Sequence, residues 1–342
     1  MRVTIKDIAQ RIGISPASVS IILNGKKGRF SNTTRKKVIE AARKMNYRPN
    51  RLAVGLLTKR TKTIGLIVSD LRNLFFSELA SGVGNYLYLK EYSMVLADTN
   101  DNFKREMQSV QVMMDHGVDG IAIAMTVQSF GKNGNEIMAL LADSGVPVVL
   151  TDSFNYTERF SSVVASTRQS SFEAVQYLAA MGHRRIACIS APLGVETLFD
   201  RFQGYLDGIA EAGIPVDEDM IAEGNFRYES GYNAMKKLFK FHPTAVFCHN
   251  DMMTFGAISA IKDKGLAIPR DISVIGFDNI FFSRFLDTPL STIEQPAYEM
   301  GEKTAEILLD EIENRTIAKR HLMLKSRFVK RESTTAPFKY PG

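Results

Sequence analysis

The 342-residue sequence lacks the features of membrane-spanning and disulfide-stabilised proteins. No apolar run approaches the ~20 residues that a membrane helix needs. The start of the chain shows no signal-peptide pattern. Two cysteines, Cys188 and Cys248, are too few for a disulfide framework, and each lies in a run typical of a buried strand. We therefore expect a cytoplasmic protein that does not associate with membranes.

Signatures of common enzymes are also missing. The five histidines have no metal-ligand spacing, and neither a Gly-x-Ser-x-Gly elbow nor a Gly-x-x-x-x-Gly-Lys phosphate loop occurs. Gly82-Val83-Gly84 falls inside an expected helix, so it is not a dinucleotide-binding fingerprint. His249 would lie near the expected cleft, but no nucleophile accompanies it. We expect no catalysis, no metal and no cofactor.

A strong charge asymmetry is present instead. Residues 1–62 hold 16 Lys and Arg against Asp7 and Glu40, a net charge of 16 − 2 = +14. The remainder holds 27 basic and 35 acidic residues, a net charge of 27 − 35 = −8. A basic head on a mildly acidic body indicates that the head binds a polyanion. A solvated lysine-rich tail is the alternative, and the folding pattern of the head argues against it.

The head has the pattern of three short helices. Their inner faces hold apolar residues at helical spacing, namely Ile5, Ile8, Ala9 and Ile12, then Val19, Ile22 and Leu23, then Val38, Ala42 and Met45. Gly13 can end the first helix in the left-handed conformation. Ser15 can cap the second helix, which Pro16 would begin, and Ser31 can cap the third. Two helices joined by a tight turn with glycine form a helix-turn-helix; an ordinary three-helix bundle fits the pattern equally, and the charge favours DNA binding.

In a helix-turn-helix the second helix enters the major groove of DNA. Its outward residues, expected over base edges, are Pro16, Ala17, Ser20 and Ile21. Pro16, Ala17 and Ile21 cannot hydrogen-bond a base through their side chains, so contact with thymine methyl groups is the interpretation open to them. Ser15, Ser18 and Asn24 are expected to hold phosphates, which fixes the position of the helix without reading sequence.

A basic linker follows the third helix. Pro49 should end that helix, and Asn50 could cap another short helix. Such a helix is marginal alone because nucleation is costly, and Val54 and Gly55 lower its propensity further. Leu56 is apolar in this basic segment. It either packs against the body or inserts as a wedge into the minor groove.

Five motifs of the head resemble the lactose-repressor/galactose-repressor family. They are Thr4-Ile5-Lys6-Asp7-Ile8-Ala9, Gly13-Ile14-Ser15, Ser18-Val19-Ser20, Leu23-Asn24-Gly25 and Tyr47-Arg48-Pro49-Asn50. The resemblance continues in register along almost the whole chain. It implies a homodimer on double-stranded operator DNA, with hinge helices, Leu56 as the minor-groove wedge, and further contacts at Thr4, Tyr47, Asn50 and Arg51. Many members carry Arg-Ser where this chain has Val54-Gly55, and Arg or His at Ile21, so the operator sequence does not carry over.

Beyond Thr63 the sequence alternates between strand and helix patterns. Apolar runs lie at residues 64–68, 94–96, 120–124 and 146–150, and a second series lies at 185–189, 245–248 and 273–277. Repeated strand–helix units with continuous apolar strands imply parallel sheets covered on both faces. Two series imply two lobes, with a break near residues 160–168. The resemblance adds that the segment around 290–325 returns to the first lobe.

The expected fold is an all-α helix-turn-helix headpiece joined to a two-lobed α/β core like that of periplasmic binding proteins. The expected parts are residues 1–48 for the DNA-binding domain, 49–62 for the hinge helix and linker, and 63–342 for effector binding and dimerisation. Within the last part, lobe 1 should span 63–164 and 292–325, and lobe 2 should span 165–291 and 326–342.

Polar residues follow directly after several apolar runs. They are Ser69-Asp70, Asp98, Asp152, Asn250-Asp251 and Asp278-Asn279. Ligands of such sheets bind beyond the carboxyl ends of the strands, here between the lobes. Any single Asp is equally well explained as a cap or turn residue, but the whole set is harder to explain in that way.

The family resemblance implies effector contacts at a related set of positions. They are Asn73, Phe75, Phe76, Asp152, Arg201, Phe226, Asn250, Asp251 and Asp278. Asp and Asn can accept hydrogen bonds from vicinal hydroxyls while Arg donates, which suits a sugar or sugar derivative. Arg201 is the one basic residue between Pro192 and Gly204, which argues against a multiply anionic effector.

We therefore interpret the chain as a sequence-specific transcriptional regulator, most simply a repressor, controlled by a small molecule. Residues 317–342 show no leucine heptads, so a dimer is expected rather than a coiled-coil tetramer. Two alternatives remain open at this point. A transport-type sugar-binding protein would share the body, but the +14 head and the missing signal peptide argue against it. A βα-rich enzyme with a regulatory head would turn over its bound metabolite.

Overall fold

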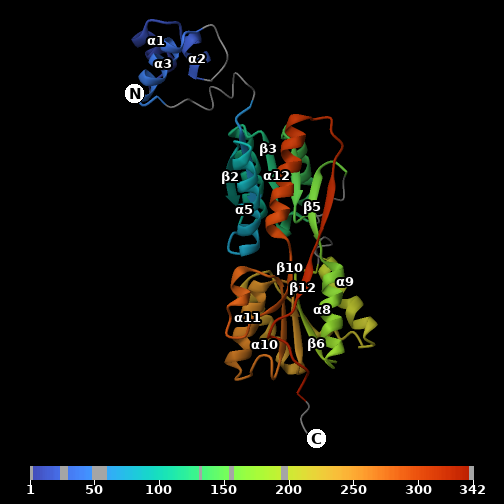
Figure 1. Cartoon of the computed structure of the whole chain (residues 1–342). Coiled ribbons are helices and arrows are strands. Elements are labelled where there is room, and N and C mark those ends of the chain that lie inside the picture. The colour runs from blue at the N-terminus through green and yellow to red at the C-terminus, as the bar shows by residue number, and fades with distance from the viewer. Residues whose placement is uncertain are drawn as a thin grey trace. The chain divides into compact units, whose positions relative to one another are not determined.

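The computed structural model describes residues 3–23, 30–47, 60–130, 133–153, 158–193 and 199–338. The chain divides into two compact units, Met1–Thr61 and Lys62–Gly342 (Figure 1). The division falls beside residue 63, where the body was expected to begin.

The first unit contains the three expected helices, α1 (Ile5–Ile12), α2 (Pro16–Leu23) and α3 (Asn32–Lys44). Gly13 ends α1 with a φ of 75°, a left-handed conformation that costs glycine little. The Oγ atoms of Ser15 and Ser31 accept hydrogen bonds from the amides of Ser18 and Thr34, both at 3.1 Å. These cap and turn predictions are confirmed. The core consists of Ile8, Ala9, Val19, Ile22, Val38 and Ala42.

The second unit contains two six-stranded sheets. The first has the order β11-β5-β4-β3-β1-β2 and is parallel throughout. Its strands are β1 (Thr63–Val68), β2 (Ser93–Asp98), β3 (Gly120–Ile123), β4 (Val148–Thr151), β5 (Ser161–Ser166) and β11 (His321–Lys325). Its helices are α5 (Leu74–Leu89), α6 (Phe103–Asp115), α7 (Gly134–Asp143) and α12 (Ala297–Glu313), with a 3-10 turn η1 (Val127–Ser129).

The second sheet has the order β12-β10-β9-β8-β6-β7, with an antiparallel β10–β12 pair and parallel pairing elsewhere. Its strands are β6 (Ile186–Ser190), β7 (Ile221–Glu223), β8 (Ala245–Cys248), β9 (Ser273–Asp278), β10 (Ser291–Glu294) and β12 (Arg327–Val329). Its helices are α8 (Arg168–Ala180), α9 (Phe199–Glu211), α10 (Tyr228–Leu238) and α11 (Asp251–Asp263), with 3-10 turns η4 (Glu218–Met220), η5 (Phe239–Phe241) and η6 (Phe281–Arg284).

Each sheet is covered on both faces, as the continuous apolar strands predicted. In lobe 1, which is built on the first sheet, one hydrophobic core lies under α5 and α12, and another lies under α6 and α7. In lobe 2 the corresponding cores lie under α8 and α9, and under α10 and α11. Among the strands predicted from apolar runs the exception is β2, an edge strand whose Val95 and Leu96 are exposed. The run at 94–96 is therefore less buried than its apolar sequence suggested.

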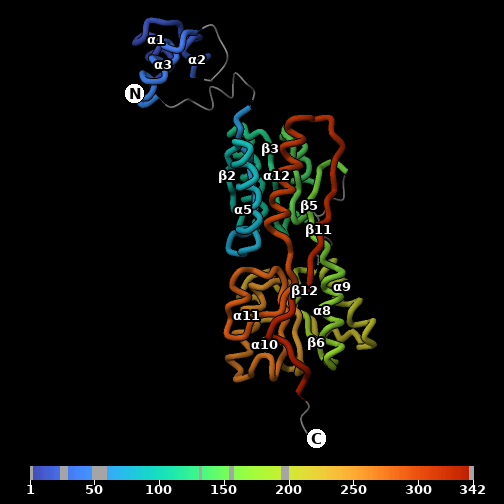
Figure 2. The backbone as a smooth tube through the Cα atoms, viewed as in Figure 1, coloured from blue at the N-terminus to red at the C-terminus, as the bar shows by residue number. Residues whose placement is uncertain are grey.

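The chain crosses between the lobes three times, after β5, after β10 and after β11 (Figure 2). The expected return of the segment around 290–325 is observed for α12 and β11. One expected boundary is wrong, because residues 292–294 belong to lobe 2. Ser291 pairs with Ile275 and Glu294 pairs with Asp278, so β10 completes the second sheet before the chain returns. The first crossing also falls later than residue 164, because β5 continues to Ser166.

Candidate functional site

Part of the expected outward face of α2 is exposed to solvent. Pro16 and Ala17 are exposed, while Ser18, Ser20 and Ile21 are half-buried. Ser15 is exposed but is also engaged as the cap of α2, where its Oγ lies 2.9 Å from the Oγ of Ser18. The apolar exposed residues at the start of the helix leave it able to make methyl contacts in a groove.

Thr4 is both a candidate DNA contact and the cap of α1. Its amide and Oγ1 both donate to Oδ2 of Asp7 at 2.8 Å, and these bonds lower the pKa of that carboxyl. Tyr47 is half-buried and packs against the core of the head. Four further candidates, Asn24, Asn50, Arg51 and Leu56, lie outside the residues that the structure describes.

The surface of the first unit is basic. Exposed cations on α1 and α3 are Lys6, Arg11, Lys36, Lys37, Arg43 and Lys44. A folded module with this surface can neutralise phosphates along a duplex.

A cavity of about 180 Å³ lies between the two lobes of the second unit. Lobe 1 contributes the segment after β1 and Asp152 after β4. Lobe 2 contributes Arg201 from α9, the segment before α10, and Asp278 at the end of β9. The cavity thus lies where the carboxyl ends of the strands of both lobes face each other, as expected for such sheets.

Arg201 is the most buried of the three arginines that line this cavity. Its Nη1 donates to the carbonyl oxygen of His249 at 2.7 Å and lies 4.0 Å from Oδ1 of Asp278. Its guanidinium also stacks on the ring of Phe277, with Cζ 4.1 Å from the ring centroid. The side chain is 9% exposed, so its charge is held by protein groups rather than by water.

Two carboxyls share that cation and have raised pKa values. Burial raises the pKa of Asp278 to about 6, although Arg201 and hydrogen bonds from Gln295 and Asn73 oppose the shift. Burial raises the pKa of Asp152 to about 7, with Arg201 lowering it and Asp278 raising it. Each group can therefore accept or donate a hydrogen bond near neutral pH, which suits recognition of hydroxyl groups.

Backbone strain is concentrated around this cavity. Asp152, Phe226 and Asp278 line it and have φ values of 50°, 65° and 105°. Non-glycine residues seldom adopt such angles unless surrounding contacts hold them. Here Phe226 is held through its carbonyl oxygen, which accepts from Nδ2 of Asn250 at 2.9 Å.

Aromatic rings form much of the remaining wall. Phe75 and Phe76 meet edge to face, with centroids 5.1 Å apart and planes at 79°. Phe130, Phe226 and Tyr228 complete the aromatic lining. Such walls can stack on the faces of a sugar or another ring.

Seven of the nine expected effector contacts line the cavity, and Asn250 and Asp251 do not. Both are fully buried. Asn250 caps α11, with Oδ1 accepting from the amide of Met253 at 2.9 Å. The carboxylate of Asp251 accepts from Oγ1 of Thr292 at 2.8 Å and from the amide of Ile280 at 2.9 Å. Neither side chain lines the cavity, because both are engaged in these contacts within the protein.

Several lining residues were not predicted, among them Arg72, Asp101, Arg227 and Glu229. Each lies within three residues of a strand end or of a predicted contact, so a prediction that included the neighbours of those positions would have contained them.

The lining contains three arginines and five acidic residues, a formal charge of 3 − 5 = −2. That balance disfavours an anionic ligand more directly than the sequence did.

His249 and the two cysteines are buried in the second lobe. Burial and the charge of Arg201 lower the pKa of His249 to about 3, and its Nδ1 accepts from the amide of Ala191 at 3.0 Å. Cys188 and Cys248 are fully buried, and burial raises the pKa of both thiols. Within the described residues no group of His, Cys, Asp or Glu could hold a metal, and no helix of that part is long and apolar enough to cross a membrane.

Fold and cavity define a two-lobed binding protein that carries a helix-turn-helix module. Comparison with known proteins agrees. Residues 4–50 match the model of bacterial regulatory proteins of the lacI family, and residues 175–334 match the periplasmic binding protein-like domain. The chain belongs to the LacI family of transcriptional regulators, so it is a DNA-binding regulator with an effector-binding domain rather than an enzyme.

Similar curated proteins span almost the whole chain. The HTH-type transcriptional repressor PurR of Vibrio cholerae is 34% identical over 334 residues, covering 96% of this chain and 97% of the repressor. Catabolite control protein A of Priestia megaterium is 35% identical over 337 residues, covering 98% of this chain and all of that protein. The Lac repressor dimer bound to operator and the anti-inducer ONPF aligns with a TM-score of 0.85 at 26% identity, covering 98% of this chain and 100% of that one.

Proposed function

We propose that this chain is a cytoplasmic homodimeric repressor whose affinity for operator DNA is set by a neutral, polyhydroxylated metabolite bound between the lobes. The observation that carries the proposal is that one chain joins a basic helix-turn-helix to a polar, aromatic-walled cavity between two lobes. Neither part alone would couple a metabolite to DNA.

The DNA-binding end rests on α2 and its surroundings. Its first residues would lie over base edges, with Ser15, Ser18 and Asn24 at phosphates. The hinge helix and the Leu56 wedge remain predictions of the family resemblance. The solved Lac repressor dimer bound to operator supports the same arrangement for this chain.

The effector class rests on the composition of the cavity. Asp152, Asp278 and Asn73 offer acceptors and donors beside Arg201, between aromatic walls. The net negative lining favours a neutral ligand over a phosphorylated one. Two solved relatives carry sugars: the regulator CelR with cellobiose, and a LacI-family regulator of Enterococcus faecium with ribose, at 28% and 30% identity. We therefore infer a sugar or sugar derivative.

Dimerisation rests on exposed apolar surface in both lobes. In lobe 1, edge strand β2 exposes Val95 and Leu96. In lobe 2, Phe281, Phe282 and Phe285 are 60%, 55% and 65% exposed and contact one another around η6. Exposed edge strands and aromatic clusters of this kind are commonly covered by a partner. A second copy of the chain is the partner that a palindromic operator requires.

The effector would act by changing the angle between the lobes. A changed angle alters the spacing of the two segments that lead to the heads, and so the fraction of dimers competent for DNA. To change the ratio of the two states from 1:99 to 99:1, the effector must bind one state about 10⁴-fold more tightly than the other.

Selection of DNA by the purified full-length protein tests this function. Thermal-shift screening against sugars, nucleosides and anionic metabolites first identifies a stabilising compound. Selection from random duplexes, with and without that compound, should then enrich a near-palindromic sequence in one of the two conditions. The condition that enriches it also defines the direction of regulation. No enrichment in either condition would refute the function, and stabilisation by anionic compounds alone would refute the effector class.

A further inference from the structure

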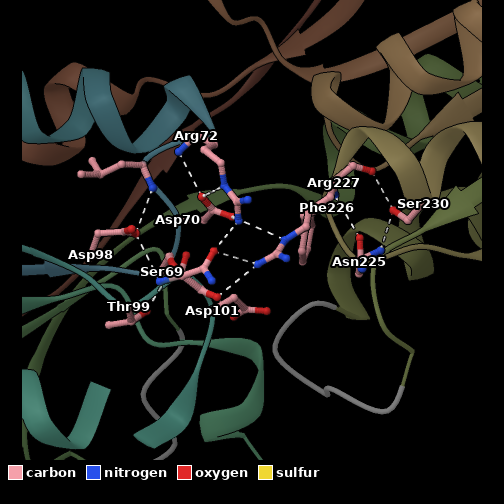
Figure 3. Close-up of polar contacts among 12 residues, drawn as sticks. Ser69, Asp70, Arg72, Asp98, Thr99, Asp101, Asn225, Phe226, Arg227 and Ser230 are labelled. Carbon is pink, nitrogen blue, oxygen red and sulfur yellow. Dashed lines mark hydrogen bonds and ion pairs between the residues drawn. The ribbon is translucent and has the colours of Figure 1, made fainter. Parts of the chain in front are cut away.

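Among the residues that line the cavity, a side chain of lobe 2 reaches across to lobe 1 (Figure 3). Arg227 lies in the segment between β7 and α10. Its Nη2 donates to the backbone oxygen and to Oδ1 of Asn100, both at 3.1 Å, and its Nε lies 3.6 Å from Oδ2 of Asp70. Asp70 and Asn100 follow β1 and β2 of the first sheet, so these contacts join the two lobes directly.

The lobe 1 side of this contact is held in place without Arg227. Arg72 donates two hydrogen bonds to the carboxylate of Asp70, from Nε to Oδ1 at 2.8 Å and from Nη2 to Oδ2 at 2.6 Å. Arg72 also donates to Oδ1 of Asn100. Burial would raise the pKa of Asp70, but hydrogen bonds and charge from Arg72, with the charge of Arg227, outweigh it and lower that pKa. The carboxylate is therefore ionised and oriented at neutral pH.

The loop that presents Asn100 has a constrained backbone. Asn100 and Asp101 both have positive φ values, 52° and 53°. Oδ1 of Asp98 accepts from the amides of Leu71 and Asn100, both at 3.2 Å, and ties the loops after β1 and β2 together. The acceptors for Arg227 are thus built into lobe 1 rather than formed by a mobile surface side chain.

The lobe 2 side is equally defined. Oδ1 of Asn225 accepts from the amide of Arg227 at 3.2 Å. Oγ of Ser230 donates to the carbonyl oxygen of Arg227 at 2.7 Å and accepts from the amide of Asn225 at 3.0 Å. These bonds fix the backbone of Arg227 next to Phe226, which lines the cavity.

The strength of the contact suits a reversible closure. The Arg227 side chain is 37% exposed, so water and salt screen it and its net contribution is small. The deeper contact between the lobes, from Nδ2 of Asn73 to Oδ2 of Asp278, is long at 3.4 Å. A weak bias toward closure leaves the equilibrium between open and closed lobes responsive to a ligand.

We propose that Arg227, with Asp70 and Asn100, forms an ionic latch that holds the lobes closed over the cavity before any effector binds. The inference deepens the proposed function, because the latched equilibrium is the one that the effector would shift. Arg227 acts as a positioning residue: it sets the resting angle of the lobes.

Interlobe distances measured in the full-length protein without DNA or metabolite test the latch. Spin labels on Lys104→Cys in α6 and Lys237→Cys in α10 report the distance, since the native cysteines are buried. Labelled protein is diluted into unlabelled protein so that pairs within one chain dominate. Arg227→Gln should raise the ratio of open to closed chains by about three- to fivefold at low salt.

The salt dependence of the interlobe distances is a second readout. It would not change with the substitution if Arg227 had a purely structural role. Raising the salt to about 0.5 M should open the parent protein toward the variant's distribution and leave Arg227→Gln nearly unchanged. The matched control is Arg320→Gln, whose side chain is 38% exposed and pairs with Asp310 at 2.8 Å within lobe 1. It should leave the distances as in the parent.

The latch is refuted if Arg227→Gln matches the parent at low salt, or if Arg320→Gln opens the lobes equally. Neither measurement uses DNA or a metabolite. Failure of the latch would leave the selection experiment on operator DNA untouched, and failure of that selection would leave the distances interpretable.

Discussion

At the residue scale, Arg201 is the buried cation of the cavity. Two buried carboxyls interact with its positive charge. Asp152 and Asp278 both depend on it, since without it burial would raise their pKa values further. Its other contacts, the carbonyl oxygen of His249 and the ring of Phe277, are made to lobe 2 alone. The residue is therefore anchored in one lobe and acts electrostatically on both.

Arg201→Ala should weaken binding of the stabilising metabolite by at least about 30-fold, equivalent to about 2 kcal/mol, because it leaves buried acceptors uncompensated. Calorimetric titration of the full-length protein measures the affinity. Arg201→Lys, which keeps the charge but loses the planar stacking geometry, should recover part of it. Arg168→Ala, which removes an exposed ion pair outside the cavity, serves as the control. Unchanged affinity in Arg201→Ala would remove Arg201 from the effector site.

Asp278 should make stability depend on pH in an unusual direction. Its pKa is 3.8 in the unfolded reference and about 6 in the folded chain, so the folded state binds the proton more tightly. The contribution of Asp278 to the free energy of unfolding is therefore greatest below pH 4. It falls by on the order of 3 kcal/mol as the pH rises to about 6. Asp278→Asn should flatten that decline.

Chemical unfolding at a series of pH values and fixed protein concentration measures this slope. Asp287→Asn should keep the slope of the parent, because Asp287 is exposed and Lys262 lowers its pKa. A variant Asp278→Asn with an unaltered slope would show that Asp278 titrates normally.

At the scale of elements, the packing of α5 on α12 depends on glycine. A Cβ on Gly82 would lie 2.0 Å from the carbonyl oxygen of Tyr298, and one on Gly301 would lie 2.1 Å from that of Leu79. The two helices thus meet backbone to backbone across one face of the first sheet (Figure 1). This pair forms much of the lobe 1 core and fixes where the chain returns from lobe 2.

Gly82→Ala should lower the free energy of unfolding by about 1–3 kcal/mol, because the helices must move apart. Gly84→Ala, on the same helix, meets only Cε of Met94 at 3.6 Å and should be neutral or stabilising by up to about 1 kcal/mol. Denaturant titration of both variants tests the difference. Equal effects would mean that helix propensity, and not the contact with α12, controls this helix.

At the scale of the whole molecule, the opposite net charges of head and body should make DNA binding and metabolite binding respond differently to salt. The head carries +14 and the body −8, so added salt should weaken operator binding and leave metabolite binding nearly constant. If the two heads of a dimer neutralise about six phosphates, the log–log slope of operator affinity against salt should be about −5. Fluorescence anisotropy across a salt series measures it, with calorimetry of the metabolite as the control. A flat operator response would contradict the electrostatic basis of binding.

Elements governed by local rules were predicted closely. The turn at Gly13 and the caps at Ser15 and Ser31 depend on contacts within a few residues, so their sequence context specifies them. The apolar runs indicated buried parallel strands, and the polar residues that follow them indicated Asp152 and Asp278. Val95 and Leu96 were misjudged because an apolar run does not reveal whether its strand lies at the edge of a sheet.

Contacts between distant segments were decided by the tertiary structure. Asn250 and Asp251 follow a strand just as Asp152 does, yet both are fully buried and hydrogen-bond to the backbone of Phe226 and to Thr292 instead of lining the cavity. The end of lobe 2 at Glu294 depends on the pairing of β10 with β9.

The sequence by itself determined the class of the protein, the helices of the head and the edge of the sheets where a ligand would lie, because helix capping and strand burial are read over short spans of chain. Only the folded chain brought Arg227 to Asn100, 127 residues away in sequence. A side chain that crosses between lobes is placed by the packing of two whole sheets, and no local pattern records that.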